Sequence, residues 1–156
     1  MTATGPSSEI AWFRRFLLGL SALVFAGTIP ELIFSEHTGS LMQWLPFVLC
    51  GAGLASVAAV WFRATPSLLK SHRLLMVLIT AGGAFGVYEH LYHNYLFEVE
   101  IRPSAGFWEA MGHALFGSSP LLAPGILTLG AVLALAFTWR HPLLEGGGAS
   151  KDAEAT

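Results

Sequence analysis

The chain has 156 residues, of which 54% are apolar and only 12% are charged. A soluble domain averages about 25% charged residues. Because so few charges cannot cover the surface of a compact protein of this size, much of that surface is expected to face lipid. The net charge of −2 offers no basic face, which argues against nucleic acid as a partner. An aromatic content of 12% argues against a disordered chain.

Four apolar runs are long enough to cross a bilayer, which takes about 20 residues in a helix. They cover residues 11–34, 41–62, 74–97 and 121–139. We therefore predict an all-α fold, an integral membrane four-helix bundle in which residues 1–143 form one domain. Residues 144–156 are predicted to be a flexible cytoplasmic tail.

The first run has an alternative interpretation as a cleaved signal peptide. Arg14 and Arg15 precede an apolar stretch that reaches small residues at Ala26 and Gly27, and this order is typical of an export signal. The apolar run continues to residue 34, however, which is longer than the apolar core of a usual signal peptide. We therefore prefer an uncleaved span.

Positively charged residues predict the orientation, because lysine and arginine collect in the cytoplasmic loops of membrane proteins. Seven of the eight lie at the start of the first run, between the second and third runs, or after the fourth: Arg14, Arg15, Arg63, Lys70, Arg73, Arg140 and Lys151. Arg102 lies on the other side, together with six of the ten acidic residues and four of the six histidines. Both termini are therefore predicted to be cytoplasmic.

Small residues at helical spacing predict where the helices approach one another. Gly82 and Gly86 lie four residues apart in the third run, and Gly51 and Ala55 lie four apart in the second. Because pairs of small residues at this spacing let two backbones come close, we predict that both pairs are helix contacts.

Residues 104–117, between the third and fourth runs, form a further short helix in our prediction. Apolar residues recur there at helical spacing on one face: Phe107, Trp108, Met111, Ala114 and Leu115. Glu109 and His113 fall on another face. We predict an amphipathic helix at the outer membrane interface, with its apolar face toward lipid or the bundle.

Ionisable residues near the outer end of the third span are the candidates for chemistry. On a helix, Glu89 and His93 lie one turn apart, and His90 and His93 share a side. Glu89 lies about 10 Å inside the predicted end of the span, where an ionisable group is unfavourable unless it meets a polar interior, a partner or a metal. We predict a transition-metal site for zinc, iron or copper, with His90, His93 and His113 as first-choice ligands. Glu89 and Glu31 are predicted as further ligands or orienting carboxylates.

Several functions remain open at this point. The first is metal binding on the outer face. The second is a non-catalytic accessory or structural subunit of a larger membrane complex, with other subunits or further copies of the chain as partners. The third is a haem-binding redox protein, in which His90 and His113 would ligate the iron. The simplest alternative is that these histidines and acids are only polar side chains of a membrane interface, and no enzymatic motif is evident.

Two stretches of the sequence have distinctive motifs. The first reads YEHLYHN at 88–94, followed by FEVE at 97–100 and RPS at 102–104, and the second reads SPLLAPG at 119–125, followed by RHP at 140–142. With these motifs, residues 29–143 resemble a group of uncharacterised short bacterial inner-membrane proteins with four predicted transmembrane helices. The resemblance implies a bacterial inner-membrane location. It implies no activity, cofactor or catalytic residue.

Overall fold

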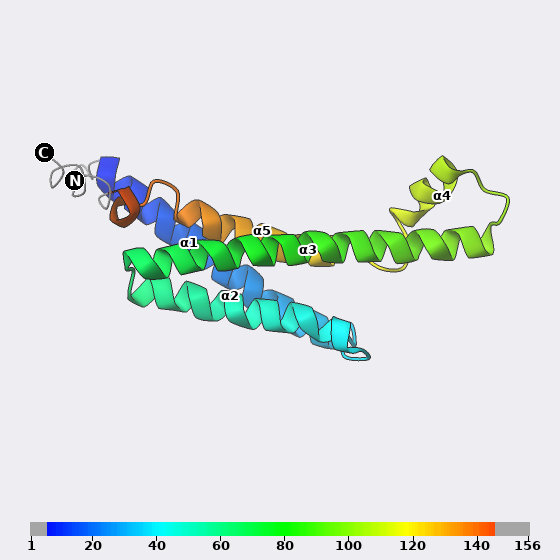
Figure 1. Ribbon diagram of the computed structural model, residues 1–156, viewed down its shortest axis with the longest axis horizontal. Coiled ribbons are helices and arrows are strands. Elements are labelled where there is room, and N and C mark those ends of the chain that lie inside the picture. The colour runs from blue at the N-terminus through cyan, green and yellow to red at the C-terminus, as the bar shows by residue number, and fades with distance from the viewer. Residues whose placement is uncertain (1–5, 146–156) are drawn as a thin grey trace, which may run out of the picture.

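The computed structural model describes residues 6–145, and this part of the chain is helical, as predicted. Its elements in chain order are α1 (Pro6–Phe34), the short 3-10 helix η1 (Leu41–Trp44), α2 (Leu45–Phe62), α3 (Pro66–Ile101), α4 (Phe107–Ala114) and α5 (Leu122–Phe137) (Figure 1). The tail predicted to be flexible lies outside the described residues from residue 146 onward.

Three helical segments are long and apolar enough to cross a membrane: Ser8–Phe34, Leu41–Phe62 and Pro66–Ile101. They contain the first three predicted spans, so the prediction of an all-helical chain with helices of membrane-spanning length is confirmed to that extent. α5 is also apolar, but it has 16 residues. That corresponds to about 24 Å of helix, somewhat less than a typical crossing helix of about 20 residues.

α3 extends beyond the predicted span at both ends. The Thr65 hydroxyl caps its first turn by accepting a hydrogen bond from the Leu68 amide at 3.2 Å, and Pro66 occupies a first-turn position where proline is tolerated. The charged residues Lys70 and Arg73 therefore lie inside the helix and not in a loop before it. With 36 residues, α3 is about 54 Å long.

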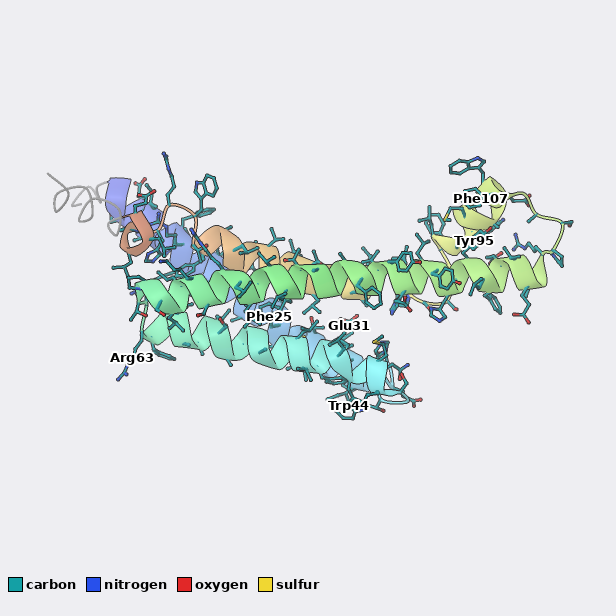
Figure 2. The ribbon with its side chains drawn as sticks, in the orientation of Figure 1. Phe25, Glu31, Trp44, Arg63, Tyr95 and Phe107 are labelled. Atoms are coloured by element: carbon teal, nitrogen blue, oxygen red, sulfur yellow. The ribbon has the colours of Figure 1, made fainter. Side chains whose placement is uncertain are left out.

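The four long helices pack around a common apolar core. α1 and α3 each pack against both α2 and α5, so that α1 and α3 lie diagonally opposite each other (Figure 1). The core includes Leu18, Phe25, Met76, Ile79, Ala131 and Ala134. Phe25 is completely buried and lies well along α1 from its start (Figure 2). Large apolar side chains are also exposed on the outward faces of these helices, which is typical of helices surrounded by lipid.

α3 and α5 approach closely at two glycines. A Cβ atom on Gly83 would overlap the Thr128 hydroxyl, and one on Gly86 would lie 2.9 Å from Pro124 Cβ. Gly86 is therefore at a helix contact, as predicted. Gly51 is not, because a Cβ atom there would have no atom within 4 Å. The prediction for Gly51 was wrong because spacing alone does not show which side of an all-apolar helix faces its neighbours.

Buried polar side chains connect the helices. The Ser21 hydroxyl in α1 donates to the Gly130 carbonyl in α5 at 2.8 Å. The His72 ring in α3 lies between α2 and α5, with Nδ1 2.7 Å from the Ser56 hydroxyl and Nε2 3.3 Å from the Ala134 carbonyl. Because a carbonyl only accepts, Nε2 is the protonated nitrogen and Nδ1 accepts from Ser56. Interhelical hydrogen bonds of this kind support helix association in lipid.

One end of the molecule collects positive charge. α1 begins there, α2 connects to α3 there, and α5 ends there (Figure 1). The described cations of these segments are Arg14, Arg15, Arg63, Lys70, Arg73 and Arg140. We call this the basic end.

Candidate functional site

At the opposite end, α3 extends past the start of α5 by about three helical turns. The register of these two antiparallel helices is defined by the contact of Gly86 with Pro124 and by a hydrogen bond from His90 Nδ1 to the Pro120 carbonyl at 2.9 Å. Residues 91–101 therefore continue beyond α5 for about 16 Å. The chain then returns along this segment through α4, which packs against α3 (Figure 1). We call residues 91–121 the overhang.

Asn94 holds the overhang together. Its side chain is 2% exposed, and its Nδ2 donates to the carbonyls of Ala114 at 3.0 Å and Ser119 at 2.9 Å. Its Oδ1 accepts from the Ser119 amide at 3.0 Å. Gly117 lies so close that a Cβ atom there would overlap the Asn94 amide group. One side chain thus fixes the whole connection from the end of α4 to the approach of α5.

α4 packs through its small residues and exposes its large ones. Ala110 and Ala114 are buried where α4 meets α3, whereas Phe107 and Trp108 are exposed. A short helix is therefore present within the predicted range, but its predicted apolar face is divided: Ala114 is buried, Phe107 lies beside Tyr95 of α3, and Trp108 is exposed. The location of α4 at a membrane interface stays a prediction.

An aromatic groove lies between α3 and α4. It has a volume of about 200 Å³ and is lined by Tyr88, Leu91, Tyr92, Tyr95, Phe107 and Met111. Tyr95 and Phe107 lie on its two sides, with ring centroids 5.7 Å apart (Figure 2). The overhang thus presents an apolar and aromatic surface.

Glu98 is a buried acid in the same overhang. It is 8% exposed and lies one helical turn after Asn94, on the face of α3 that α4 covers. Its Oε2 lies 3.6 Å from Arg102 Nε and has no hydrogen-bond partner in the part of the chain that the structure describes. This burial was not predictable from the sequence, because Glu98 is followed by the charged residues Glu100 and Arg102 at the predicted end of a span.

His37 and His90 form a histidine pair between the turn after α1 and α3. Their ring centroids are 6.1 Å apart. Because the Pro120 carbonyl only accepts, His90 Nδ1 carries the hydrogen of that bond, and in the neutral ring Nε2 keeps a free lone pair. Burial lowers the pKa of His37, and the adjacent His90 lowers it further, so His37 is neutral near pH 7. His90 was predicted as a ligand and His37 was not, because His37 was indicated only by its position among the four histidines of the outer half.

The other predicted ligands do not join this pair. The exposed His93 ring donates from Nδ1 to the backbone carbonyl of Glu89 at 2.8 Å, and the same nitrogen lies 3.9 Å from the Glu89 carboxylate. His113 on α4 is exposed. Glu31 on α1 is also exposed (Figure 2). Within residues 6–145, no three His, Cys, Asp or Glu side chains are close enough to hold a metal ion. The five predicted ligands, which are His90, His93, His113, Glu89 and Glu31, therefore do not form one site in the structure.

No protein-family model matches the chain, and comparisons with curated proteins and with solved structures give no significant match. The observations that bear on function are therefore the exposed surface of the overhang, the His37 and His90 pair, and the separation of charge between the two ends.

Proposed function

We propose that the protein is a non-catalytic accessory subunit of a membrane complex, crossing a bacterial inner membrane four times and contacting its partner through the overhang. The proposed orientation has the basic end in the cytoplasm, in line with the general excess of lysine and arginine on that side. α5 serves as the fourth span. The apolar residue Leu121 before it and the tryptophan at position 139 after it extend its length toward the roughly 30 Å of a hydrocarbon core.

The observation that supports a partner is the exposed aromatic surface of the overhang. α3 is about 54 Å long, well beyond the roughly 30 Å needed to cross the hydrocarbon core, so its last turns are available for another task. Phe116 is 92% exposed and Trp108 is 82% exposed. Grouped exposed aromatic side chains are typical of interaction sites, where they supply much of the binding energy.

The charge of the overhang favours a different membrane protein over a second copy of the chain. Residues 91–121 contain Glu98, Glu100 and Glu109 but only one cation, Arg102. Two overhangs in contact would bring like charges together, which is unfavourable. A partner with an apolar groove and a basic rim is complementary to this surface.

Photo-crosslinking in cells tests this proposal. Benzoylphenylalanine at position 116 or 108 is expected to give one defined adduct with another membrane protein, and a control at Phe62 is expected to give none. Phe62 is a matched control because it is 81% exposed and lies at the basic end. The adduct should disappear in the Asn94→Leu background, in which the overhang loses its internal hydrogen bonds. Adducts with lipid alone, or with a second copy of the chain, would contradict the proposal.

A second candidate function, metal binding, is supported by the histidine pair. A zinc ion bound to a ring nitrogen of each histidine would lie about 3 Å from each ring centroid. The centroid separation of 6.1 Å between His37 and His90 is compatible with one ion between them. The hydrogen bond from His90 Nδ1 to a backbone carbonyl is the usual second-shell support of a ligating histidine. A haem bound between His90 and His113 has no comparable support.

Zinc titration of the detergent-solubilised protein by calorimetry tests the metal hypothesis. We expect one zinc ion per chain, with affinity reduced at least about tenfold in His37→Ala or His90→Ala, because each removes one of the two protein ligands. His93→Ala is the matched control and is expected to bind zinc normally, since its ring is exposed and bonded within its own helix. An equal loss in His93→Ala and His113→Ala would instead favour the ligand set predicted from sequence.

A further inference from the structure

Two arginines from different helices meet at the C-terminal end of α5. Arg14 of α1 donates from Nη2 to the carbonyls of Trp139 at 3.2 Å and Arg140 at 2.7 Å. Arg73 of α3 donates from Nε to the Thr138 hydroxyl at 2.8 Å and from Nη2 to the Thr138 carbonyl at 2.6 Å. The last carbonyls of a helix have no partner within the helix and bear partial negative charge, so these bonds explain why both side chains come to this point.

Both guanidinium groups have N–H donors beyond those used in the hydrogen bonds described above. Each guanidinium has five N–H donors, and the hydrogen bonds above involve one nitrogen of Arg14 and two of Arg73. No ion pair within residues 6–145 includes either residue. Two positive charges therefore lie at the end of α5, and neither is ion-paired with a carboxylate among residues 6–145.

His141 adds a third donor to this place. The Leu143 amide donates to His141 Nδ1 at 3.3 Å, so the neutral ring carries its hydrogen on Nε2. Arg14 bonds to the carbonyl of the residue before His141, and Arg73 bonds to Thr138, three residues before it. Burial lowers the pKa of His141, and the charges of Arg14 and Arg73 lower it further. The ring is held edge-on against Phe137, with centroids 5.5 Å apart.

Tryptophans at the same end indicate what lies around these donors. Trp12, Trp61 and Trp139 are 67%, 47% and 73% exposed and belong to α1, α2 and the segment after α5. Exposed tryptophans gather at the level of lipid headgroups in membrane proteins. In the proposed membrane location, this places the donors at the depth of the headgroup phosphates.

We infer that Arg14, Arg73 and His141 form a binding site for the phosphate of an anionic phospholipid headgroup at the basic end. Basic pockets between transmembrane helices on the cytoplasmic side are suited to such headgroups, and planar guanidinium groups match phosphate oxygens in geometry. The inference rests on the proposed membrane location and is independent of the proposed partner at the overhang.

Native mass spectrometry of the protein in a neutral detergent tests the site, with phosphatidylglycerol and phosphatidylcholine of identical acyl chains competing for it. We expect a preference of roughly 25-fold for phosphatidylglycerol, about fivefold for each arginine. The preference should fall to near unity in the R14Q/R73Q double variant. The R140Q variant removes the same kind of charge from an exposed side chain and should keep the preference, since the Arg140 side chain is 78% exposed.

The R14Q/R73Q variant also loses bonds to the end of α5, so a second variant, H141L, is included in case the double variant does not fold. The neutral His141 ring donates to the phosphate of either lipid, so H141L is expected to lower the affinity for phosphatidylglycerol about threefold through the loss of one hydrogen bond. Equal binding of both lipids by the unaltered protein, an unchanged affinity in H141L, or an equal loss of preference in R140Q would overturn the inference. Displacement of bound phosphatidylglycerol by millimolar inorganic phosphate would show a site for free anions and would also overturn it. If the protein inserts into membranes but shows no preference for phosphatidylglycerol, the lipid site is refuted and the proposed membrane location is not.

Discussion

Replacing Asn94 with leucine is expected to release α4 from α3 while leaving the other helices packed. The substitution keeps the approximate size of the side chain but removes all three of its hydrogen bonds, which join α3 to Ala114 and Ser119. Each buried polar group left without a partner is unfavourable by about 1 kcal/mol or more. A total of about 3 kcal/mol corresponds to a roughly hundredfold increase in local opening.

Hydrogen exchange measures this release directly. The backbone amides of α4 and of the connection to α5 should exchange about a hundred times faster in Asn94→Leu, whereas those of α1 and α2 should be unchanged. His93→Leu is the matched control, because the neighbouring His93 side chain is exposed and its ring donates to a carbonyl of its own helix. If His93→Leu opened the overhang equally, Asn94 would not be its main attachment.

Replacing Gly83 with leucine is expected to separate α3 from α5. Even the first added carbon would overlap the Thr128 hydroxyl and lie 3.0 Å from the Pro124 carbonyl oxygen and the Thr128 amide nitrogen. Backbone atoms cannot rotate away as a side chain can, so the helices must move apart. Overpacking of this kind destabilises a core by about 3 kcal/mol, and the bonds from His72 and Arg73 to the last turns of α5 would be stretched at the same time.

The comparison for this prediction is Gly51→Leu, in which the added side chain enters open space. Titration of the solubilised protein with a denaturing detergent should show a lower midpoint for Gly83→Leu and an unchanged or slightly higher one for Gly51→Leu, since leucine is the better helix former. Equal destabilisation by both substitutions would mean that the close contact of α3 with α5 does not determine stability.

The helices were predictable because long apolar runs form helices whatever their tertiary contacts. The length of α3 was not predictable, because charged residues such as Lys70 and Arg73 are typical of a loop between two spans. In the structure they continue the helix, and Arg73 finds acceptors at the end of α5, 65 residues further along the chain. Whether a charged residue near a span continues its helix depends on such distant partners, and these are not visible in a local pattern.

The histidine pair was only half predictable for a similar reason. His90 was identified from its position in the third run, but His37 approaches it only because the chain turns sharply after α1. Glu36 adopts a left-handed backbone conformation there, with φ of 53°. Such a conformation is uncommon for a residue other than glycine, so no rule of sequence reading would assign it to Glu36.

Asn94 shows the same dependence on distant contacts. Its motif was noticed, yet its acceptors and donor lie 20 and 25 residues away. The position of an asparagine near the end of a predicted span does not by itself indicate such contacts. Only the return of the chain through α4 makes it the attachment of the overhang.

The orientation of the chain in the membrane is most directly tested by cysteine accessibility in spheroplasts. The native Cys50 is first replaced by serine, and single cysteines are then placed at Ala64, between α2 and α3, and at Ser104, between α3 and α4. A membrane-impermeant maleimide is expected to label Ser104→Cys in intact spheroplasts and Ala64→Cys only after lysis. Labelling of Ala64→Cys in intact spheroplasts, or protection of Ser104→Cys, would contradict a protein with its basic end in the cytoplasm and its overhang outside.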